Sequence, residues 1–426
     1  MRVLHKIYAF IHKPLDIYRQ KKSEQYFWKE ISDVNQRGEA LRKKDVIKVL
    51  FILPNLPKWK TESLYRAMLT HPRFEPMIGV AVGTTDYPSE IINKITTLES
   101  YLNEKHYPFI ELSSSLDIKE NVKPDIIFYQ EAGLCGGLNN SLQFQNLKKD
   151  SLLCYICYAF LTIDVKELYD SPLQNYCWMF FAENQDVKDY AKTAMHNKAQ
   201  NMVITGYPLA DDLLSDDKQE NPWKEGAGRK RIIWAPHHTI GVNYDLLHYG
   251  NFLEIADFMV KLAEKTKNDV QWAFKPHPVL KQKLQYVWGK EKTDSYYQKW
   301  AEMENTQLEL GQYVDLFKSS DAIIHDSGSF TIEYLYMHKP CMYLVNGKPH
   351  ELNEFGQKAY NMYYKGRNCE DIEQFVQNVI DGIDPRKEER EQFFKDYLLP
   401  PNSRTACENI IAAILGEPPY DKNHKV

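Results

Sequence analysis

The stretch Lys-Pro-His-Pro, residues 275–278, follows an apolar run and combines a cation with an imidazole. Pro276 fixes its own φ angle, and Pro278 disfavours a helical conformation at His277. Residues two apart in an extended chain point to the same side, so we expect Lys275 and His277 to face one ligand. The pair suits anion binding or proton transfer. Taken alone, these residues also fit a strand-ending turn with a surface histidine.

A second apolar run ends in Ala-Pro-His-His-Thr, residues 235–239. We expect one of His237 and His238 to point into a cleft and the other out of it. An imidazole titrates near neutral pH, which suits a base that takes a proton from an attacking hydroxyl. Both are therefore catalytic candidates together with His277. Pro236 and Thr239 are expected to contact the donor substrate.

A third segment, His-Asp-Ser-Gly-Ser-Phe, joins an apolar strand to a predicted helix at residues 325–330. Gly328 permits close approach of the backbone, and Ser327 and Ser329 offer hydroxyls and a helix cap. Free backbone N–H groups and the helix dipole attract a phosphate at such a place. The alternative is an ordinary capped turn between a strand and a helix.

Acidic residues near this segment have expected supporting roles. Asp326 is a donor-site candidate and, like Asp321, a candidate to orient a histidine, and Glu333 can accept from ribose hydroxyls. The chain contains no phosphate-binding P-loop motif, no Gly-x-Gly-x-x-Gly after a strand and no His-Glu-x-x-His. We therefore predict no metal site and no cofactor, with cations at a diphosphate supplied by Lys275 or imidazolium.

The three polar segments must be positioned by the elements around them. Apolar strands alternate with helical patterns on both sides of a polar stretch, which predicts parallel sheets covered by helices on both faces. The predicted fold is α/β and GT-B-like, with two facing Rossmann-like domains and a ligand cleft between them. The expected units are a helical arm, an acceptor domain, a linker, a nucleotide-donor domain, and a final helix and tail: 1–45, 46–214, 215–230, 231–405 and 406–426.

Composition excludes several classes of protein. A chain of 426 residues with a formal net charge of -5 favours two globular domains and argues against nucleic-acid binding. The sequence has no long apolar run and no secretory signal, and seven scattered cysteines suit a reducing compartment, so we expect a cytoplasmic protein. Residues 1–22 are basic with apolar residues at helical spacing. They predict contact with an anionic membrane surface, or alternatively an arm packed on the domain.

The order of these segments resembles the CDP-glycerol glycerophosphotransferase family of bacteria, which includes teichoic acid primases and polymerases of GT-B fold. The resemblance rests on VITGYPLADDLL, APHHT, KPHP and DLFKSSDAIIHDSGSFTIEYLYMHKPCMYL, and it spans roughly residues 125–350. Residues 326–329 stand where the family has Asp-Tyr-Ser-Ser, and Lys339 with Pro340 stands at its Lys/Arg-Pro pair. The likeness is specific in the second domain and thin in the first.

The resemblance implies transfer of glycerol phosphate, or a related polyol phosphate, from a CDP-linked donor to an acceptor hydroxyl, with release of CMP. The acceptor would be lipid-linked or a polysaccharide, in the synthesis of a teichoic acid, a capsule or a similar polymer. His277 matches the family's His-Pro motif as a catalytic or phosphate-contacting residue. Ser327 and Ser329 would hold donor phosphate, and Glu333 would hold glycerol or ribose hydroxyls.

The chain departs from the family pattern in two places. The family's Trp-His-Gly-Thr motif, which supplies a proposed base, falls near residues 154–160, where this chain has no histidine. The base would then be His237 or His238, or the acceptor differs. The segment with Gly328 also departs from the Asp-Tyr-Ser-Ser pattern and so alters the donor pocket. Two other functions stay open from the residues: a GT-B glycosyltransferase that uses a nucleotide sugar, and a non-catalytic nucleotide-binding partner in polysaccharide assembly.

Overall fold

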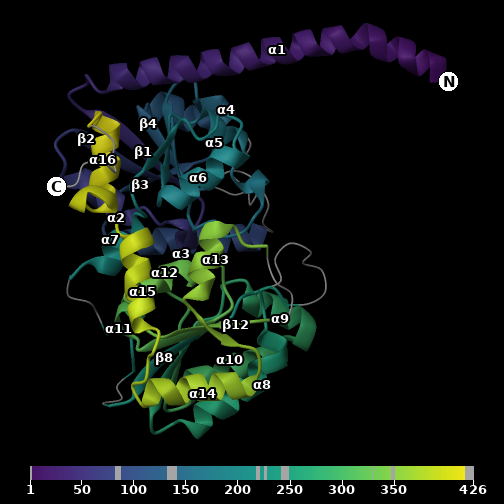
Figure 1. The fold of residues 1–426 in the computed structure, drawn as a ribbon. Helices are drawn as coiled ribbons and strands as arrows, with labels where there is room; N and C mark the ends of the chain where they lie inside the picture. The colour runs from purple at the N-terminus through teal and green to yellow at the C-terminus, as the bar shows by residue number, and fades with distance from the viewer. Residues whose placement is uncertain are drawn as a thin grey trace.

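The computed structural model describes most of the chain. The described residues are 2–81, 88–131, 142–216, 221–224, 228–240, 249–328, 330–346 and 351–417. Within these ranges the side chains of 2–20 and 88–94 are not described. Two α/β halves lie one above the other, and the long first helix α1 (Arg2–Leu41) runs along the outer side of the first half (Figure 1).

The first half is built on a seven-stranded parallel sheet with the order β3-β2-β1-β4-β5-β6-β7. Its central strands are short apolar runs that are buried on both faces, which is typical of parallel sheets. The strands are β1 (Ile47–Leu53), β2 (Phe74–Ala81), β3 (Phe109–Leu112), β4 (Ile126–Tyr129), β5 (Leu152–Ile156), β6 (Met179–Ala182) and β7 (Met202–Ile204).

Helices cover both faces of this sheet. Several begin at a side-chain cap, as α5 does at Ser171 and α6 at Asn184, because these side chains accept from free N–H groups of the first turn. The helical segments are η1 (Leu56–Lys58), α2 (Glu62–Thr70), α3 (Pro88–Glu104), the π-helical turn η2 (Asp117–Val122), α4 (Phe144–Leu147), η4 (Lys166–Leu168), α5 (Pro172–Tyr176), α6 (Gln185–Ala194) and α7 (Leu209–Leu214).

The second half is built on a six-stranded parallel sheet with the order β10-β9-β8-β11-β12-β13. The chain order reverses between β8 and β11, which pair side by side, and ligands of such sheets bind at the carboxyl ends of the strands at this point. The strands are β8 (Lys230–Ala235), β9 (Val270–Phe274), β10 (Thr306–Leu308), β11 (Ala322–His325), β12 (Cys341–Leu344) and β13 (Tyr364–Gly366).

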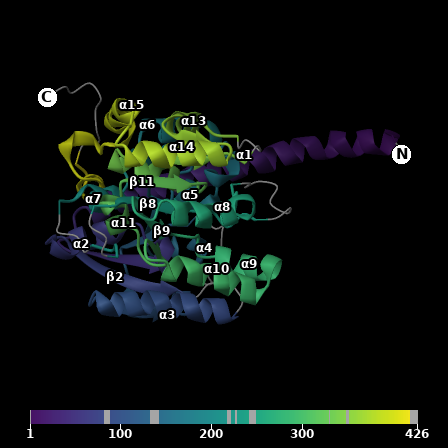
Figure 2. The same cartoon turned by 90° about the horizontal axis from the view of Figure 1, so that it is seen from below.

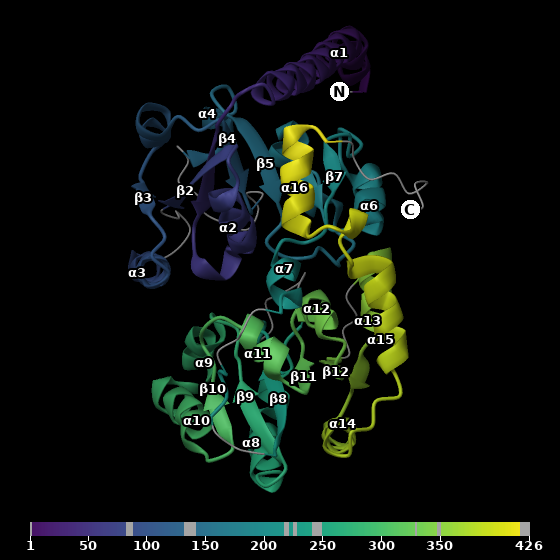
Figure 3. The ribbon, with the colours of Figure 1, turned by 90° about the vertical axis from the view of Figure 1, so that its left-hand side faces the viewer.

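The helices of the second half flank its sheet and then return to the first half. Figure 3 shows α16 beside β7 of the first half and α13 and α15 beside the junction of the two halves. They are α8 (Phe252–Lys265), α9 (Leu280–Trp288), α10 (Lys290–Glu302), α11 (Val314–Ser319), α12 (Phe330–Glu333), η5 (Tyr334–Met337), α13 (Glu354–Asn361), α14 (Cys369–Ile380), α15 (Lys387–Phe393), η6 (Phe394–Leu398), η7 (Pro401–Ser403) and α16 (Ala406–Leu415).

The two halves are joined by a common apolar core as well as by the chain that connects them. One buried cluster contains Tyr155 and Tyr207 from the first half with Phe317 and Phe355 from the second. The segment after β5 also pairs with the segment before α13, through an antiparallel bridge between Ile163 and Leu352. The carboxyl ends of both sheets therefore meet across one junction, and the expected architecture of two facing Rossmann-like domains is confirmed.

Helix α1 is anchored by its second half. Phe27 packs edge-on against Tyr176 and His196, and Val34 and Leu41 join the core under the first sheet. The first half of α1 extends away from the body of the molecule (Figure 2). The basic face expected of residues 1–22 lies outside the described side chains up to residue 20. Among the described residues, no helix has an apolar stretch long enough to cross a bilayer.

The structure differs from the sequence-based expectation at small scale. Two three-residue edge strands, β10 and β13, were not expected. Residues 281–302, whose sequence favours a single helix, form two helices, α9 and α10, because Gly289 adopts a left-handed φ of 83° between them.

Candidate active site

A pocket of about 300 Å³ lies where the two sheets face each other. Loops after β8, β9 and β11 form its wall in the second half. Loops after β4 and β5 form its wall in the first half. The second half contributes His237, His238, Tyr249, His277, Ser327 and Gly328, and the first half contributes Glu131, Tyr155, Cys157, Tyr158 and the run 159–163, with Glu167, Leu168 and Ser171.

The three candidate histidines come together in this pocket, and the expectation that one of His237 and His238 points out of it is wrong. The ring centroids lie 4.3 Å apart for His237 and His238, 4.1 Å for His238 and His277, and 5.1 Å for His237 and His277. A backbone hydrogen bond of 3.0 Å from His277 to the carbonyl of Pro236 holds the two loops together. The separate segments therefore build one imidazole cluster.

Each imidazole accepts a hydrogen bond at its Nδ1 atom. The amide of Val279 donates to Nδ1 of His277 at 3.2 Å, and the ammonium of Lys283 donates to Nδ1 of His238 at 2.7 Å. The hydroxyl oxygen of Thr239 already accepts from the amides of Tyr249 and Gly250, so its proton goes to Nδ1 of His237 at 3.0 Å. When neutral, all three rings then carry their proton on Nε2.

Burial keeps two of these rings neutral at physiological pH. It lowers the pKa of His277 to about 3, and the nearby His238, Lys283 and Lys275 lower it further. Burial and the charge of Lys283 lower the pKa of His238 to about 4. The cluster thus presents neutral imidazoles with N–H donors on Nε2, an arrangement that suits the oxygens of a phosphate.

The same histidines lie close enough to one another to be considered as metal ligands, with potential ligand atoms within 4.8 Å. A histidine that binds a metal through Nε2 normally donates from Nδ1–H to an acceptor. Here the Nδ1 atoms face N–H and O–H donors instead, so binding through Nε2 would demand imidazolate. The hydrogen bonds therefore favour an anion at this cluster over a metal ion.

Asp326 and Thr239 brace the loops rather than line the pocket. Asp326 is fully buried and accepts from the amide of His237 at 2.6 Å and from the amide of Asn251 at 2.7 Å. Burial raises its pKa to about 6. Pro236, which precedes His237 in the chain, is also buried. Asp321 lies at the other end of the sheet, where it accepts from the amide of Arg231, and so does not orient a histidine.

Ser327 and Gly328 line the pocket, whereas Ser329 lies outside the described residues. A Cβ atom on Gly328 would lie 3.3 Å from the hydroxyl of Tyr249, which is closer than most such contacts. The ring of Tyr249 therefore packs closely against this turn. The turn is held by the Thr331 hydroxyl, which donates to the carbonyl of Ser327 at 2.8 Å.

Glu333 and Lys275 lie in the junction of the two halves and are not among the described residues that line the pocket. Both oxygens of Glu333 are engaged, by the hydroxyl of Tyr313 at 2.5 Å and by that of Tyr207 at 3.0 Å. Lys60, from the first half, donates to the hydroxyl of Tyr313 at 2.6 Å. This chain of contacts, which we call the junction network, ties the two halves together through buried polar groups.

We expected Lys275 and His277 to face one ligand, but of the two only His277 is among the described residues that line the pocket. The ammonium of Lys275 donates to the carbonyl of Gly311 at 2.7 Å and lies 5.7 Å from the centre of the Tyr313 ring. Burial, together with the charge of Lys60, lowers its pKa to about 8, and Glu309 opposes this shift. Two buried lysines therefore add positive potential close to the imidazole cluster.

The first-half wall carries a group that sequence reasoning missed. Glu131 lies two residues after the end of β4 and is 7% exposed. Its Oε1 atom accepts from Lys58 at 2.6 Å, and its Oε2 atom is buried with no hydrogen-bond partner among the described residues. The signal was available in the sequence, because Gln130 and Glu131 end an apolar strand at the edge where ligands bind.

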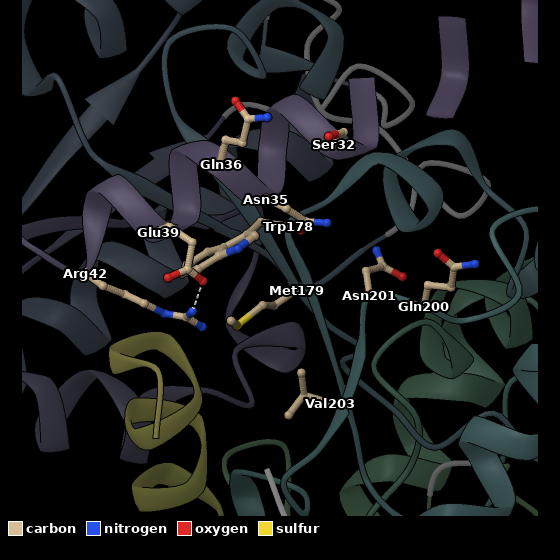
Figure 4. Close-up of a pocket in the computed structure, with 10 residues that line it drawn as sticks. All are labelled: Ser32, Asn35, Gln36, Glu39, Arg42, Trp178, Met179, Gln200, Asn201 and Val203. Carbon is tan, nitrogen blue, oxygen red and sulfur yellow. Dashed lines mark hydrogen bonds and ion pairs between the residues drawn. The ribbon is translucent and has the colours of Figure 1, made fainter. Parts of the chain in front are cut away.

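A second pocket lies between α1 and the edge formed by β6 and β7 (Figure 4). Its polar groups already serve the fold. Arg42 is paired with Glu39, and the Asn201 amide donates to the carbonyls of Gln174 and Cys177. We therefore place the candidate active site in the junction pocket.

Comparisons with known proteins agree with this architecture. The chain is similar to the wall teichoic acid polymerase TagF, with 11% identity, a TM-score of 0.57, and coverage of 93% of this chain and 97% of that one. It is also similar to the UDP-GlcNAc 2-epimerase of Neisseria meningitidis in complex with UDP-GlcNAc, with 16% identity, a TM-score of 0.56, and coverage of 87% and 100%. These likenesses show the fold, which is GT-B. No curated protein matches the sequence.

The family is shown by a separate match of the sequence to a family model. The match is to the CDP-glycerol:poly(glycerophosphate) glycerophosphotransferase family and spans residues 167–416 of 426, more than half of the chain. It includes the loops after β8, β9 and β11, which form the second-half wall of the pocket. This chain therefore belongs to the CDP-glycerol:poly(glycerophosphate) glycerophosphotransferase family and is a transferase.

Proposed function

We propose that this transferase moves glycerol phosphate from CDP-glycerol to a hydroxyl of a growing cell-surface polymer and releases CMP. The observation that carries the proposal is the cluster of neutral imidazoles at the switch point of the donor-side sheet, within a family defined by this reaction. Nε2–H donors, a serine hydroxyl and nearby buried lysines are the groups that a diphosphate needs. The protein then acts by positioning and charge stabilisation.

The proposed donor site belongs to the second half. His237, His238 and His277 would donate to phosphate oxygens, with Ser327 and the backbone at Gly328 beside them. Asp326, Thr239 and Pro236 would keep the loops in place, and Lys275 would add positive potential. Glu333 would act through the junction network. Each donor aimed at developing phosphate charge is typically worth about 10² to 10³ in rate.

The proposed acceptor site belongs to the first half, whose wall carries aromatic side chains and a carboxylate. We take residues 46–214 as the acceptor domain and 231–405 as the donor domain, with 215–230 between them. The acceptor is a lipid-linked or polysaccharide chain of a teichoic acid, capsule or similar bacterial polymer. The basic residues of 1–22, on a helix that extends from the body, support contact with an anionic membrane at its inner face.

The test is a measurement of binding and turnover with matched nucleotides. The purified full chain is titrated with CDP-glycerol, CDP-ribitol, CDP, UDP-GlcNAc and GDP while thermal unfolding is followed. A ligand at a hundred times its dissociation constant stabilises the folded protein by about 2.7 kcal/mol. CMP release is then measured with CDP-glycerol and a synthetic poly(glycerol phosphate) primer.

We expect a shift of the unfolding midpoint that is selective for the CDP compounds, and primer-dependent release of CMP. A shift with UDP-GlcNAc alone would overturn the proposal in favour of a glycosyltransferase. Binding of CDP-glycerol without any CMP release would favour a non-catalytic nucleotide-binding protein. For the membrane contact, deletion of residues 1–22 should lower partition onto vesicles that contain anionic lipid, and unchanged partition would remove that role.

A further inference from the structure

Transfer to a hydroxyl requires a group that accepts the hydroxyl's proton, and the imidazole cluster is poorly suited to this. A general base needs an available lone pair. The Nδ1 lone pairs of His237, His238 and His277 already accept from Thr239, Lys283 and the amide of Val279. Their Nε2 atoms carry protons. In this arrangement the cluster donates hydrogen bonds and takes no proton.

Glu131 lies on the other wall of the same pocket and has the lone pairs that the cluster lacks. Lys58 holds Oε1 at 2.6 Å, which fixes the carboxylate in place. The ammonium of Lys58 in turn lies 5.4 Å from the centre of the Tyr158 ring, another residue of this wall. Oε2 has no hydrogen-bond partner among the described residues and is shielded by the protein.

A buried carboxylate oxygen without a partner is costly for the fold. Leaving such an acceptor unsatisfied costs about 1–3 kcal/mol, and more when the group is charged. A glutamine at this position would fill the same space without a buried charge. The orphaned oxygen is therefore better explained by a ligand that supplies the missing hydrogen bond, such as an acceptor hydroxyl.

Two other carboxylates of the first half are weaker candidates. Glu167 also lines the pocket, but it lies on the exposed turn η4, where water competes for its oxygens. Glu183 follows β6 and is buried, and burial raises its pKa to about 7, but it is not among the described residues that line the pocket. Of the described lining residues, Glu131 alone combines burial, a fixed position and an unpartnered oxygen.

We propose that Glu131 is the general base that activates the acceptor hydroxyl, and that Lys58 is the positioning residue for it. The assignment rests on the proposed function. The acceptor oxygen forms a bond to the phosphorus that carries glycerol, while its proton passes to Oε2 of Glu131. The bond from that phosphorus to the bridging oxygen breaks, and CMP leaves with the electron pair. The glutamic acid then returns its proton to water.

The experiment compares four forms of the full chain: wild type, Glu131→Gln, Glu131→Ala and Glu167→Gln, which tests the other carboxylate that lines this wall. CMP release is measured with CDP-glycerol and the poly(glycerol phosphate) primer, and donor binding is measured in parallel from thermal unfolding. We expect Glu131→Gln to lower kcat about 10² to 10⁴-fold, because general base catalysis is typically worth that much. The dissociation constant of CDP-glycerol should stay within about twofold, because Glu131 lies on the opposite wall.

Rescue by added formate distinguishes a general base from a residue that only supports the fold. Added formate should raise CMP release by Glu131→Ala, whose cavity can admit a small carboxylate, and should leave Glu131→Gln unchanged. If Glu131→Gln or Glu131→Ala fails to fold, Glu131→Asp serves in its place, since it keeps a carboxylate at a greater distance. Its kcat should then fall less than the 10²-fold expected for loss of the base.

The outcomes separate this inference from the function beneath it. Full turnover by Glu131→Gln beside an active wild type would overturn the role of Glu131 alone. Loss of turnover in Glu167→Gln but not in Glu131→Gln would move the base to Glu167. No CMP release by the wild type, with or without primer, would overturn the proposed function and this assignment with it.

Discussion

The two walls of the junction pocket have opposite chemistry. The second-half wall presents imidazoles that donate hydrogen bonds, with two buried lysines close by. The first-half wall presents aromatic rings and a carboxylate whose one oxygen is unpartnered among the described residues. One wall thus suits an anionic donor, and the other suits a neutral hydroxyl that must lose a proton.

This contrast explains how one pocket can serve a two-substrate reaction in which separate residues bind the phosphate and accept the proton. Donors on one side stabilise charge that leaves with the nucleotide, and an acceptor on the other side takes up the proton. Neither wall needs a group that both donates and accepts. Variants of the two walls should therefore have different effects. Variants of the second-half wall should weaken donor binding, and variants of the first-half wall should slow the proton transfer.

Apart from the Glu131 variants, the largest effect is expected at the donor wall. His277→Ala removes an Nε2–H donor and the ring that packs on His238, so kcat should fall about 10² to 10³-fold and donor affinity should fall with it. The matched control is His71→Ala, which removes a histidine at the end of α2 away from the pocket. Kinetics with CDP-glycerol for both variants give the answer. Unchanged kcat in His277→Ala would remove the imidazole cluster from the mechanism.

The next effect concerns how the walls are held together. Tyr313→Phe takes a hydroxyl out of the junction network and leaves Lys60 and one Glu333 oxygen without their partner, at a cost of about 1–3 kcal/mol in the free energy of unfolding. Urea unfolding measures this cost. Tyr286→Phe, at a tyrosine that is 83% exposed, is the control and should change nothing. Equal stability of both variants would mean that the network does not bind the halves together.

A smaller effect is expected from the partner of Glu131. Lys58→Met keeps much of the side chain's volume but removes the cation that holds Oε1. We expect kcat to fall about tenfold, at the low end for a group that acts only by orienting a base, with donor binding unchanged. Lys58→Arg should recover most of the loss, because guanidinium also pairs with carboxylates. A Lys58→Met variant that weakens donor binding instead would place this residue at the donor.

The smallest effect is on the pH dependence of stability. The pKa of His277 is lowered to about 3 in the folded protein, from an ordinary value of 6.5. Below pH 6.5 the unfolded chain binds a proton that the folded protein does not, so this contribution to stability is present above pH 6.5 and is lost as the pH falls toward 3. His277→Asn should therefore lose less stability between pH 7 and pH 5 than wild type does, by on the order of 1 kcal/mol. Equal losses in urea titrations would contradict this.

Much of the fold could be predicted because the strands and helices of a parallel α/β sheet have clear local sequence patterns. Strands such as β1 and β9 are short apolar runs that end in a proline or polar cluster, and helices such as α8 show a clear apolar stripe. The edge strands β10 and β13 have three residues each, too few to show alternation. They exist because a neighbouring strand is there to pair with, which no local pattern records.

The candidate site was predictable on one wall and not on the other. The imidazole cluster follows from strand-ending loops on neighbouring strands, which local patterns reveal. The partners of Glu333 do not, because Tyr207 lies 126 residues away in the chain and on the other half. Glu131 was overlooked because a single acidic residue after a strand is common. Its meaning appears only when the structure shows one oxygen held and the other without a partner.

The last helix has a consequence for how the protein is made. Helix α16 follows the whole second half in the chain, yet Ile410 and Ile414 complete the apolar core under the first sheet. Asp211, on α7 of the first half, accepts from the amides of Ala406 and Cys407 at 2.8 and 2.9 Å and so caps α16 from outside. On the ribosome the first half is synthesised early but must wait, with part of its core uncovered, until residues 406–415 emerge. The half that is translated first is thus the last to complete its apolar core.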